Sequence, residues 1–289
     1  MSQNKQYFLN ILQLNIAVLF ISTSGVLGRY IALYPIVTIF YRTLLAVVIF
    51  YAYCKWKKID LKLKTPRDKF LTILGGVLMG IHWVTYFFSL QYSTVAIAIL
   101  SIFTYPVITA FLEPVFLKSN FNKIHLLLGV LVITGVYFLS PEIDFKNKYF
   151  IAVIFGIISA IFYSLRNILM KKQLGKYSSS SLMFYQILVI CICLSPMIFF
   201  SNFSEVAMQW KPLLILAVLT TCIGHTMFVR SFKNFSITTA SIMSSVQPIY
   251  GIILAVIFLN EIPSPKVMIG GALILSAVLI ESFVGLKKT

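Results

Sequence analysis

Residues 224–261, GHTMFVRSFKNFSITTASIMSSVQPIYGIILAVIFLNE, decide the fold of this chain. Two apolar runs flank a short polar break at Lys233 and Asn234, and both runs are too long and too apolar for the core of a soluble domain. Each run still holds polar groups, a Gly-His pair in the first and Gln247-Pro248 in the second, where a lipid-facing helix would not. The stretch therefore predicts two membrane helices that border a solute path.

The composition extends this prediction to the whole chain. Of the 289 residues, 59% are hydrophobic and 11% are charged, with a mean hydropathy of +0.93. Soluble domains are about half apolar and one quarter charged. Apolar runs of about 20 residues recur along the chain, as helices that cross about 30 Å of hydrocarbon require, whereas a β-barrel shows weak alternation in segments of about ten residues. The fold class predicted is an all-α polytopic membrane protein.

Charged residues, prolines and glycines divide the chain into ten apolar segments. The connections between them are too short to fold independently, so any function must be built within the helix bundle. The first segment is long enough to be an uncleaved span rather than a signal peptide. The ten expected transmembrane helices cover roughly 11–33, 36–55, 70–90, 94–117, 124–140, 149–171, 181–201, 211–232, 237–259 and 266–285.

The formal net charge of +16 follows the loops. With a cytoplasmic N-terminus, sixteen of the 24 Lys and Arg residues fall on the cytoplasmic side, four on the other side and four within spans. Because basic loops resist translocation, this bias places both termini in the cytoplasm, and no nucleic acid partner is needed to explain the charge. The four cysteines have neither metal-ligand spacing nor a disulfide framework and are expected to be buried apolar side chains, so no metal or other cofactor is predicted.

Weak internal similarity relates the two halves of the chain. His82 corresponds to His225 at an offset of 143, and Pro106 corresponds to Pro248 at an offset of 142. Each half then contains five spans. Because five is odd, the second half crosses in the opposite sense, which is an inverted-topology repeat with a pseudo-two-fold axis in the membrane plane. The two halves are predicted to cover residues 1–143 and 144–289.

Short motifs punctuate the spans in both halves. They are Ser24-Gly25 to Arg29, Arg42, Gly80-Ile81-His82-Trp83, Tyr105-Pro106, Gly224-His225 with Arg230, Gln247-Pro248-Ile249-Tyr250 to Asn260-Glu261, and Gly270-Gly271. This series resembles the drug/metabolite transporter superfamily, specifically its EamA-type permeases of ten spans. The resemblance covers nearly the whole chain. One departure is Lys118-Ser119, where the first repeat of the family often ends in Gly-Glu.

The resemblance implies a carrier that moves small organic solutes, often metabolites or amino acids out of a bacterial cytoplasm, through a central cavity between the halves. It implies a multi-pass protein of the bacterial inner membrane, with a small-molecule solute and the lipid bilayer as partners. A homo-oligomer is compatible with this plan. Since no nucleotide-binding motif or soluble domain occurs, the more specific hypothesis is a proton-driven exporter of amino acids or similar metabolites that works by alternating access.

Four arginines lie within the expected spans, where a central charge costs at least about 2.5 kcal/mol. Arg166 and Arg230 are expected to snorkel to the cytoplasmic interface, and Arg29 is expected to anchor the outer end of its span. Arg42 lies deeper. It is a candidate to bind a solute carboxylate or to organise a polar network.

Three titratable residues are candidates for proton coupling. His82 and His225 titrate near neutral pH, so proton coupling and a hydrogen-bonded tie between helices both stay open for them. Glu113 lies well inside a span and is either a proton relay or an ion-pair partner of Lys118. Glu261, at the outer end of its span, is expected to serve helix termination or gating.

The other candidates are aromatic and polar residues that lie near a histidine, a proline or a small residue. Aromatic walls would stack on an apolar or aromatic solute, while serine and glutamine would bond to its polar end. Pro106 and Pro248 are expected to break their helices in mid-span and to free backbone carbonyls. The candidate cavity residues are Arg42, His82, Trp83, Tyr86, Ser101, Tyr105, Tyr163, His225, Ser244, Gln247 and Tyr250.

Two other functional classes are weighed against a carrier. A membrane-embedded enzyme acting on lipid-linked substrates would also place polar residues within spans. Catalysis favours carboxylates, histidines or a cysteine clustered at one depth near a polar loop, and this chain has eight Asp and Glu residues in all. A receptor or scaffold would use a large loop or tail, which the sequence does not contain. The sequence therefore favours a carrier.

Overall fold

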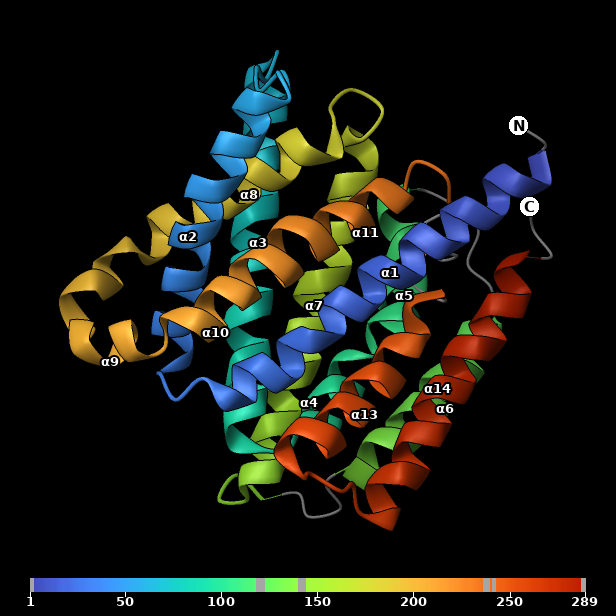
Figure 1. Ribbon diagram of the computed structural model, residues 1–289. Helices are drawn as coiled ribbons and strands as arrows, with labels where there is room; N and C mark the ends of the chain where they lie inside the picture. The colour runs from blue at the N-terminus through green and yellow to red at the C-terminus, as the bar shows by residue number, and fades with distance from the viewer. Residues whose placement is uncertain (1–2, 118–122, 140–143, 236–239, 241–242, 287–289) are drawn as a thin grey trace.

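Among the residues that the computed structural model describes, each of the ten apolar segments contains one or more helical elements (Figure 1). The structure describes residues 3–117, 123–139, 144–235, 240 and 243–286, and no strand occurs in these ranges. Seven helices are long and apolar enough to cross a membrane, and three shorter apolar helices accompany them. The elements are α1 (Gln3–Tyr30), α2 (Pro35–Trp56), α3 (Pro66–Tyr92), α4 (Val95–Ile102), α5 (Tyr105–Leu117), α6 (Ile124–Leu139), α7 (Lys148–Gln173), α8 (Ser179–Leu194), η1 (Ser195–Phe200), α9 (Phe203–Met208), α10 (Trp210–Ile215), η2 (Leu216–His225), α11 (Thr226–Ser231), η3 (Ser244–Val246), α13 (Gln247–Leu259) and α14 (Pro265–Leu286).

Local chemistry fixes several helix ends. Helices α2 and α3 begin at Pro35 and Pro66, where the missing N–H would have no intrahelical partner in any case. The side chain of Thr65 caps α3 by accepting a hydrogen bond from the Asp68 N–H at 3.1 Å. At its C-terminal end, α13 stops at Asn260, which adopts the left-handed conformation with φ 54°. Asparagine tolerates this conformation better than most residues. The chain turns sharply there.

The expected span over 94–117 is broken at Phe103 and Thr104 into α4 and α5. Its counterpart in the second half, α13, has the same length as α5 and lies at the repeat offset of 142. Pro106 and Pro248 are each the second residue of their helix and not its middle, because a helix start tolerates a missing N–H. A break precedes Pro106, whereas Pro248 follows the short helix η3 without an interruption. Part of the expected span over 237–259 falls on residues 236–239 and 241–242, which lie outside the described residues.

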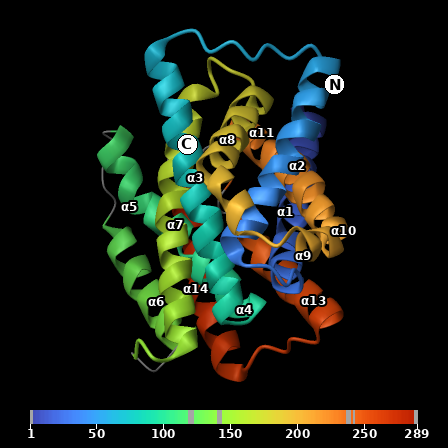
Figure 2. The ribbon, with the colours of Figure 1, turned by 90° about the vertical axis from the view of Figure 1, so that its left-hand side faces the viewer.

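Helix packing follows the repeat. Helix α3 lies along α7, and the pair related by exchange of the halves, η2 with α11 against α1, is packed in the same way. Helices α2 and α8 pair with each other, as do α6 and α14, which run side by side in Figure 1. Figure 2 shows α3 next to α7 from the side. Most of the major contacts thus join one half to the other.

The halves run in opposite directions. The end of α1 lies near Glu261, while the end of α7 lies near the start of α3, so α1 and α7 finish at opposite ends of the bundle. We call the end that carries the loops 57–65 and 174–178 the basic end, and the end that carries 31–34 and 260–264 the distal end. Both ends of the described chain lie toward the basic end (Figure 1).

Glycines allow close helix contacts across this plan. A Cβ atom on Gly76 of α3 would lie 2.7 Å from the Cβ of Val189 in α8, and one on Gly270 of α14 would lie 2.6 Å from the backbone oxygen of Gly135 in α6.

The cysteines are less uniformly buried than the sequence predicts. Three of the four free cysteines are buried, but Cys193 is exposed, so the prediction of a buried side chain is wrong for it.

Replacing Gly270 by alanine is expected to lower the stability of the purified protein in detergent by about 1 to 3 kcal/mol, because two backbones must separate to admit the methyl group. The loss would appear as a lower midpoint of thermal aggregation. Gly175→Ala is the matched control, since nothing lies within 4 Å of a Cβ there. Equal midpoints for the two variants would contradict the close contact between α6 and α14.

Candidate functional site

Side chains from both halves converge in the middle of the bundle around a small cavity. Its volume is about 20 Å³, enough for roughly one water molecule. Since no organic solute fits such a space, the helices around it must move apart to admit one. The lining residues are Ile21, Ser24, Arg42, His82, Trp83, Tyr86, Ile102, Phe103, Tyr105, Tyr163, His225 and Gln247.

Arg42 of α2 is the charged group of this cavity, and its side chain is 1% exposed. Its Nε donates to the hydroxyl of Thr221 at 2.6 Å, and its Nη2 donates to the hydroxyl of Thr220 at 3.0 Å. The guanidinium carbon lies 4.0 Å from the ring centre of Trp83, a cation–π contact. Among the described residues no carboxylate pairs with this guanidinium. The hydroxyls and the ring therefore solvate the charge without neutralising it.

The two threonines belong to η2, a ten-residue π-helix in the expected span over 211–232. Both hydroxyls also contact the backbone oxygen of Leu216, Thr220 at 2.5 Å and Thr221 at 3.2 Å. π-Helical turns are rare and occur frequently at functional sites. Here the turn presents two consecutive hydroxyls to one guanidinium. Gly224 lets the same element approach α1, because a Cβ there would lie 3.0 Å from a side-chain carbon of Ile21.

Two buried ring nitrogens near Arg42 have no hydrogen-bond partner among the described residues. They are the Nε1 of Trp83 and the Nδ1 of His225. The two rings lie 5.2 Å apart between centres, one from each half. Buried polar atoms are normally paired. Together with Arg42 they give the cavity unused capacity for hydrogen bonds and for a negative charge.

His82, the repeat counterpart of His225, is in a different environment. Its Nδ1 lies 2.8 Å from the hydroxyl of Ser159, which itself donates to the His82 backbone oxygen at 2.8 Å. The ring stacks on Tyr163 at 4.3 Å, and Tyr163 packs edge-on against Tyr105. The Tyr105 hydroxyl lies 2.6 Å from that of Ser244. His82 thus ties α3 to α7 at the site.

The sequence candidates divide into those at the cavity and those away from it. Eight line it: Arg42, His82, Trp83, Tyr86, Tyr105, Tyr163, His225 and Gln247. Ser101 donates to the Ile97 backbone oxygen and packs against Gly156, while the Ser244 hydroxyl contacts that of Tyr105 in the cavity wall. Tyr250 is partly buried against the hydrophobic core. Their predicted contact with solute is therefore not supported by these positions. Solute binding by the other eight stays a prediction.

Sequence reasoning missed Ser24, Ile21, Ile102 and Phe103 in the cavity wall, and Ser159, Thr220 and Thr221 behind it. Single serines and threonines are common in membrane helices, so their residue type gives little warning of a role. The two consecutive threonines at 220 and 221, within an apolar segment, are the one sequence feature that could have indicated a polar position there.

Glu113 of α5 lies away from the cavity. Its charge interacts with that of Lys171 in α7. Lys118, the partner expected from the sequence, lies outside the described residues. A role of Glu113 in proton coupling stays a prediction.

Arg166 corrects a prediction from the sequence. It is fully buried and does not snorkel. Its Nε and Nη2 donate to the Gln186 side-chain oxygen at 2.9 and 2.8 Å, and its Nη1 donates to Asn167 at 3.0 Å. All of these partners lie in the second half. Position along the helix indicated a nearby interface, but the side chain turns inward because Gln186 of α8 offers an acceptor.

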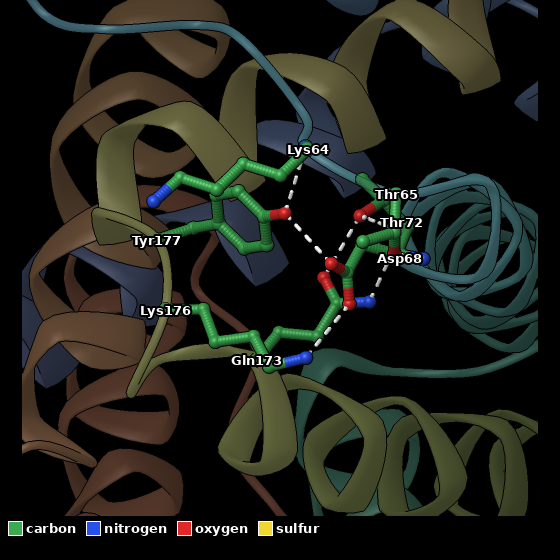
Figure 3. A network of polar contacts seen from close by, with 7 residues as sticks. All are labelled: Lys64, Thr65, Asp68, Thr72, Gln173, Lys176 and Tyr177. Atoms are coloured by element: carbon green, nitrogen blue, oxygen red, sulfur yellow. Dashed lines mark hydrogen bonds and ion pairs between the residues drawn. The ribbon is translucent and has the colours of Figure 1, made fainter.

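A polar network closes the basic end (Figure 3). The Asp68 carboxylate at the start of α3 accepts hydrogen bonds from the Tyr177 hydroxyl at 2.8 Å and from Lys176 at 3.3 Å. Thr72 donates to Gln173 at 2.8 Å, and Gln173 donates to the Asp68 backbone oxygen at 3.3 Å. Partial burial raises the pKa of Tyr177, so its hydroxyl stays protonated and keeps donating. We call this set the basic-end network.

A second ionic contact closes the distal end. One Glu261 oxygen accepts from the Nε of Arg29 at 3.0 Å, and the other accepts from the backbone N–H of Val95, the first residue of α4, at 2.8 Å. Glu261 therefore caps a helix of the opposite half while it pairs with α1. We call this the distal contact. Both ends are fastened while the central cavity stays small.

Among the described residues no group of three or more His, Cys, Asp and Glu side chains could hold a metal ion. The model of the EamA-like transporter family matches residues 9–140 and 150–283. The chain belongs to the EamA-like transporter family. The predicted boundary between residues 143 and 144 adjoins 140–143, which lie outside the described residues.

Several relatives of this chain have names that describe transport. Protein RarD of Salmonella typhimurium is 26% identical over 230 residues, 78% of this chain and 76% of that protein. An uncharacterized transporter of Archaeoglobus fulgidus is 27% identical over 72% of this chain and 75% of its own length. The pseudopaline exporter CntI of Pseudomonas aeruginosa strain UCBPP-PA14 is 20% identical over 72% of each chain. A solved crystal structure shares the fold, with a TM-score of 0.69, 15% identity and coverage of 96% of this chain and 98% of that one.

Glu261→Gln is expected to reduce transport by less than about fivefold and to leave its pH dependence unchanged, because a half-exposed ion pair is worth about 1 kcal/mol or less. Rates would be measured in vesicles across a pH series. Glu205→Gln makes the same change at an exposed position of α9 and is the control. A lost pH response in Glu261→Gln would show that this carboxylate takes part in coupling.

Proposed function

We propose that this transporter is a secondary carrier of small organic solutes that bear a carboxylate, such as amino acids. Its ten apolar segments all span the bacterial inner membrane, as two inverted repeats that meet between residues 143 and 144. Its basic end and both termini face the cytoplasm. The carrier exports its solute by alternating access, and self-association is compatible with this arrangement.

Arg42 is the observation that carries the proposal. A buried cation without a carboxylate partner costs several kcal/mol, and such a cost persists where the charge has a function. A solute carboxylate supplies the missing negative charge. The unpaired nitrogens of Trp83 and His225 lie on the same cavity and add donors or acceptors for the rest of the solute.

The two fastened ends support alternating access. The basic-end network and the distal contact each join the first half to the second, and the cavity between them has room for about one water. A solute can enter from one side when the contacts at that end open while those at the other end hold. In this proposal, the arrangement with both ends closed is the occluded state of the cycle.

Charge and relatives support the orientation and the direction. The loop 57–65 with its lysines lies at the basic end, and positively charged loops are retained in the cytoplasm. One relative is named a pseudopaline exporter, which favours export for this chain as well.

Arg42→Gln is expected to reduce uptake of a carboxylate solute into proteoliposomes by roughly 10- to 150-fold, because a hydrogen bond to a charged group contributes about 1.5 to 3 kcal/mol. The assay would use a panel of radiolabelled amino acids in counterflow, together with the matching amines that lack the carboxylate. Arg42→Lys should fail to restore uptake. The planar guanidinium of arginine bonds to both threonines at once, and the single ammonium group of lysine does not have this geometry.

The control for this experiment is Arg67→Gln, which removes the same charge from an exposed position at the start of α3. It should transport at the rate of the unaltered protein. Amines and amino acids transported equally well by the unaltered protein would contradict the role of Arg42. Product formation from a lipid-linked substrate in detergent, without vesicles, would instead support an enzyme.

His225→Gln is expected to flatten the dependence of transport on pH between about 5 and 8, because its unpaired imidazole meets water and takes up a proton once the helices around the cavity move apart. His82→Gln should lower the rate yet keep the slope, since the His82 ring is already held by Ser159. Parallel pH profiles for both variants and the unaltered protein would exclude coupling through either histidine.

A further inference from the structure

A second and larger hollow lies between α2, α8 and the segment formed by η2 and α11, near the basic end. Its volume is about 510 Å³, which is in the range of sites that hold drug-sized ligands. We call it the basic-end groove. The residues that line it are Ile49, Phe50, Tyr53, Ser178, Ser179, Ser180, Val218, Cys222, Ile223, Thr226, Met227, Arg230 and Lys233.

One end of the groove is cationic. Arg230 and Lys233 are exposed, and neither forms an ion pair with a described residue. No Asp or Glu is among the lining residues. Lys171 differs from these two residues, because its ammonium donates hydrogen bonds to the backbone oxygens of Phe232 and Phe235 after the end of α11. Two positive charges therefore stand unneutralised at the mouth of one hollow.

Polar atoms accompany these two cations. Ser178 is the N-cap of α8, and Ser179 and Ser180 lie in the first turn of this 16-residue helix, whose N-terminus carries a partial positive charge. Charges and donors of this kind suit the oxygens of a phosphate group.

The rest of the groove is apolar and runs away from the basic end. Its wall is made by Ile49 and Phe50 of α2 and by Val218, Ile223 and Met227 of the segment opposite. Ile223 is 37% exposed, so the groove is open along the outside of the bundle. A small soluble anion would gain nothing from contact with this apolar wall. A hydrocarbon chain attached to the anion would be stabilised there, because it buries apolar surface.

We propose that the basic-end groove binds an anionic phospholipid of the cytoplasmic leaflet. Its phosphate lies between Arg230, Lys233 and the serines of α8, and its acyl chain lies along Ile223 and Met227. Basic pockets between membrane helices on the cytoplasmic side are suited to such headgroups. The proposal rests on the orientation proposed above, but not on the identity of the transported solute.

The site also has a place in the transport cycle. Cys222 and Thr226 line the groove, while His225 of the same segment lines the central cavity and Thr221 accepts a hydrogen bond from Arg42. A lipid held between α8 and this segment therefore fixes the element that carries the partners of Arg42. When the basic end opens, the segment formed by η2 and α11 has to move relative to the bound lipid.

The test measures lipid retention by the full-length protein in detergent, independently of transport. Purified protein would be mixed with phosphatidylglycerol or phosphatidylcholine, and bound lipid counted by native mass spectrometry. The unaltered protein should keep phosphatidylglycerol preferentially. Arg230→Gln with Lys233→Gln should weaken its binding by roughly 30-fold, which corresponds to about fivefold for each cation. Ile223→Trp, which keeps the cations and fills the apolar wall, should weaken it as well.

The matched control is Lys55→Gln with Lys57→Gln, which removes two charges from the same end outside the groove, where each ammonium lies over an aromatic ring. It should retain the lipid as the unaltered protein does. Equal losses in both double variants would show a diffuse surface attraction and overturn the proposal. So would displacement of the lipid by millimolar glycerol phosphate, which would identify a soluble anion as the occupant. Failure of the transport assay with intact lipid retention would reject the proposed solute alone.

Discussion

A guanidinium buried at the meeting of the two halves, with no carboxylate to pair with, is the constraint on which the centre of this protein depends. Arg42 requires solvation inside a bundle that excludes water, and the chain supplies it from η2 through two hydroxyls and from α3 through an aromatic face. Arg166 is buried to the same degree but is satisfied within its own half by Gln186 and Asn167. Neither guanidinium has a carboxylate partner among the described residues, and Arg42 is the one of the two that lines the central cavity.

The repeat explains why the site lies where it does, and its departures from symmetry explain what the site can do. Exchange of the halves relates α3 with α7 to η2 and α11 with α1, and both repeat-related histidines line the central cavity. His82 is held by Ser159, whereas His225 keeps an unpaired nitrogen. A symmetric scaffold has in this way acquired one structural histidine and one that is free for chemistry.

The thickness of the bilayer made the fold predictable from sequence. A helix that crosses hydrocarbon needs about 20 apolar residues whatever its neighbours are, so ten segments and the repeat could be read from composition and spacing. The direction in which each side chain points could not, because membrane helices are apolar on both their lipid and protein faces. This is why Tyr250 and Ser101 were expected in the cavity, why Arg166 was expected at the interface, and why the π-helix and Ser159 were missed.

The central claim is that a solute carboxylate pairs with Arg42 between the halves. A structure of the full-length protein with a transported amino acid bound tests it most directly. The account predicts a carboxylate oxygen within about 3 Å of the guanidinium, in a cavity enlarged well beyond 20 Å³ by separation of η2 from α3. A solute bound elsewhere, with Arg42 still held by Thr220 and Thr221 alone, would contradict it.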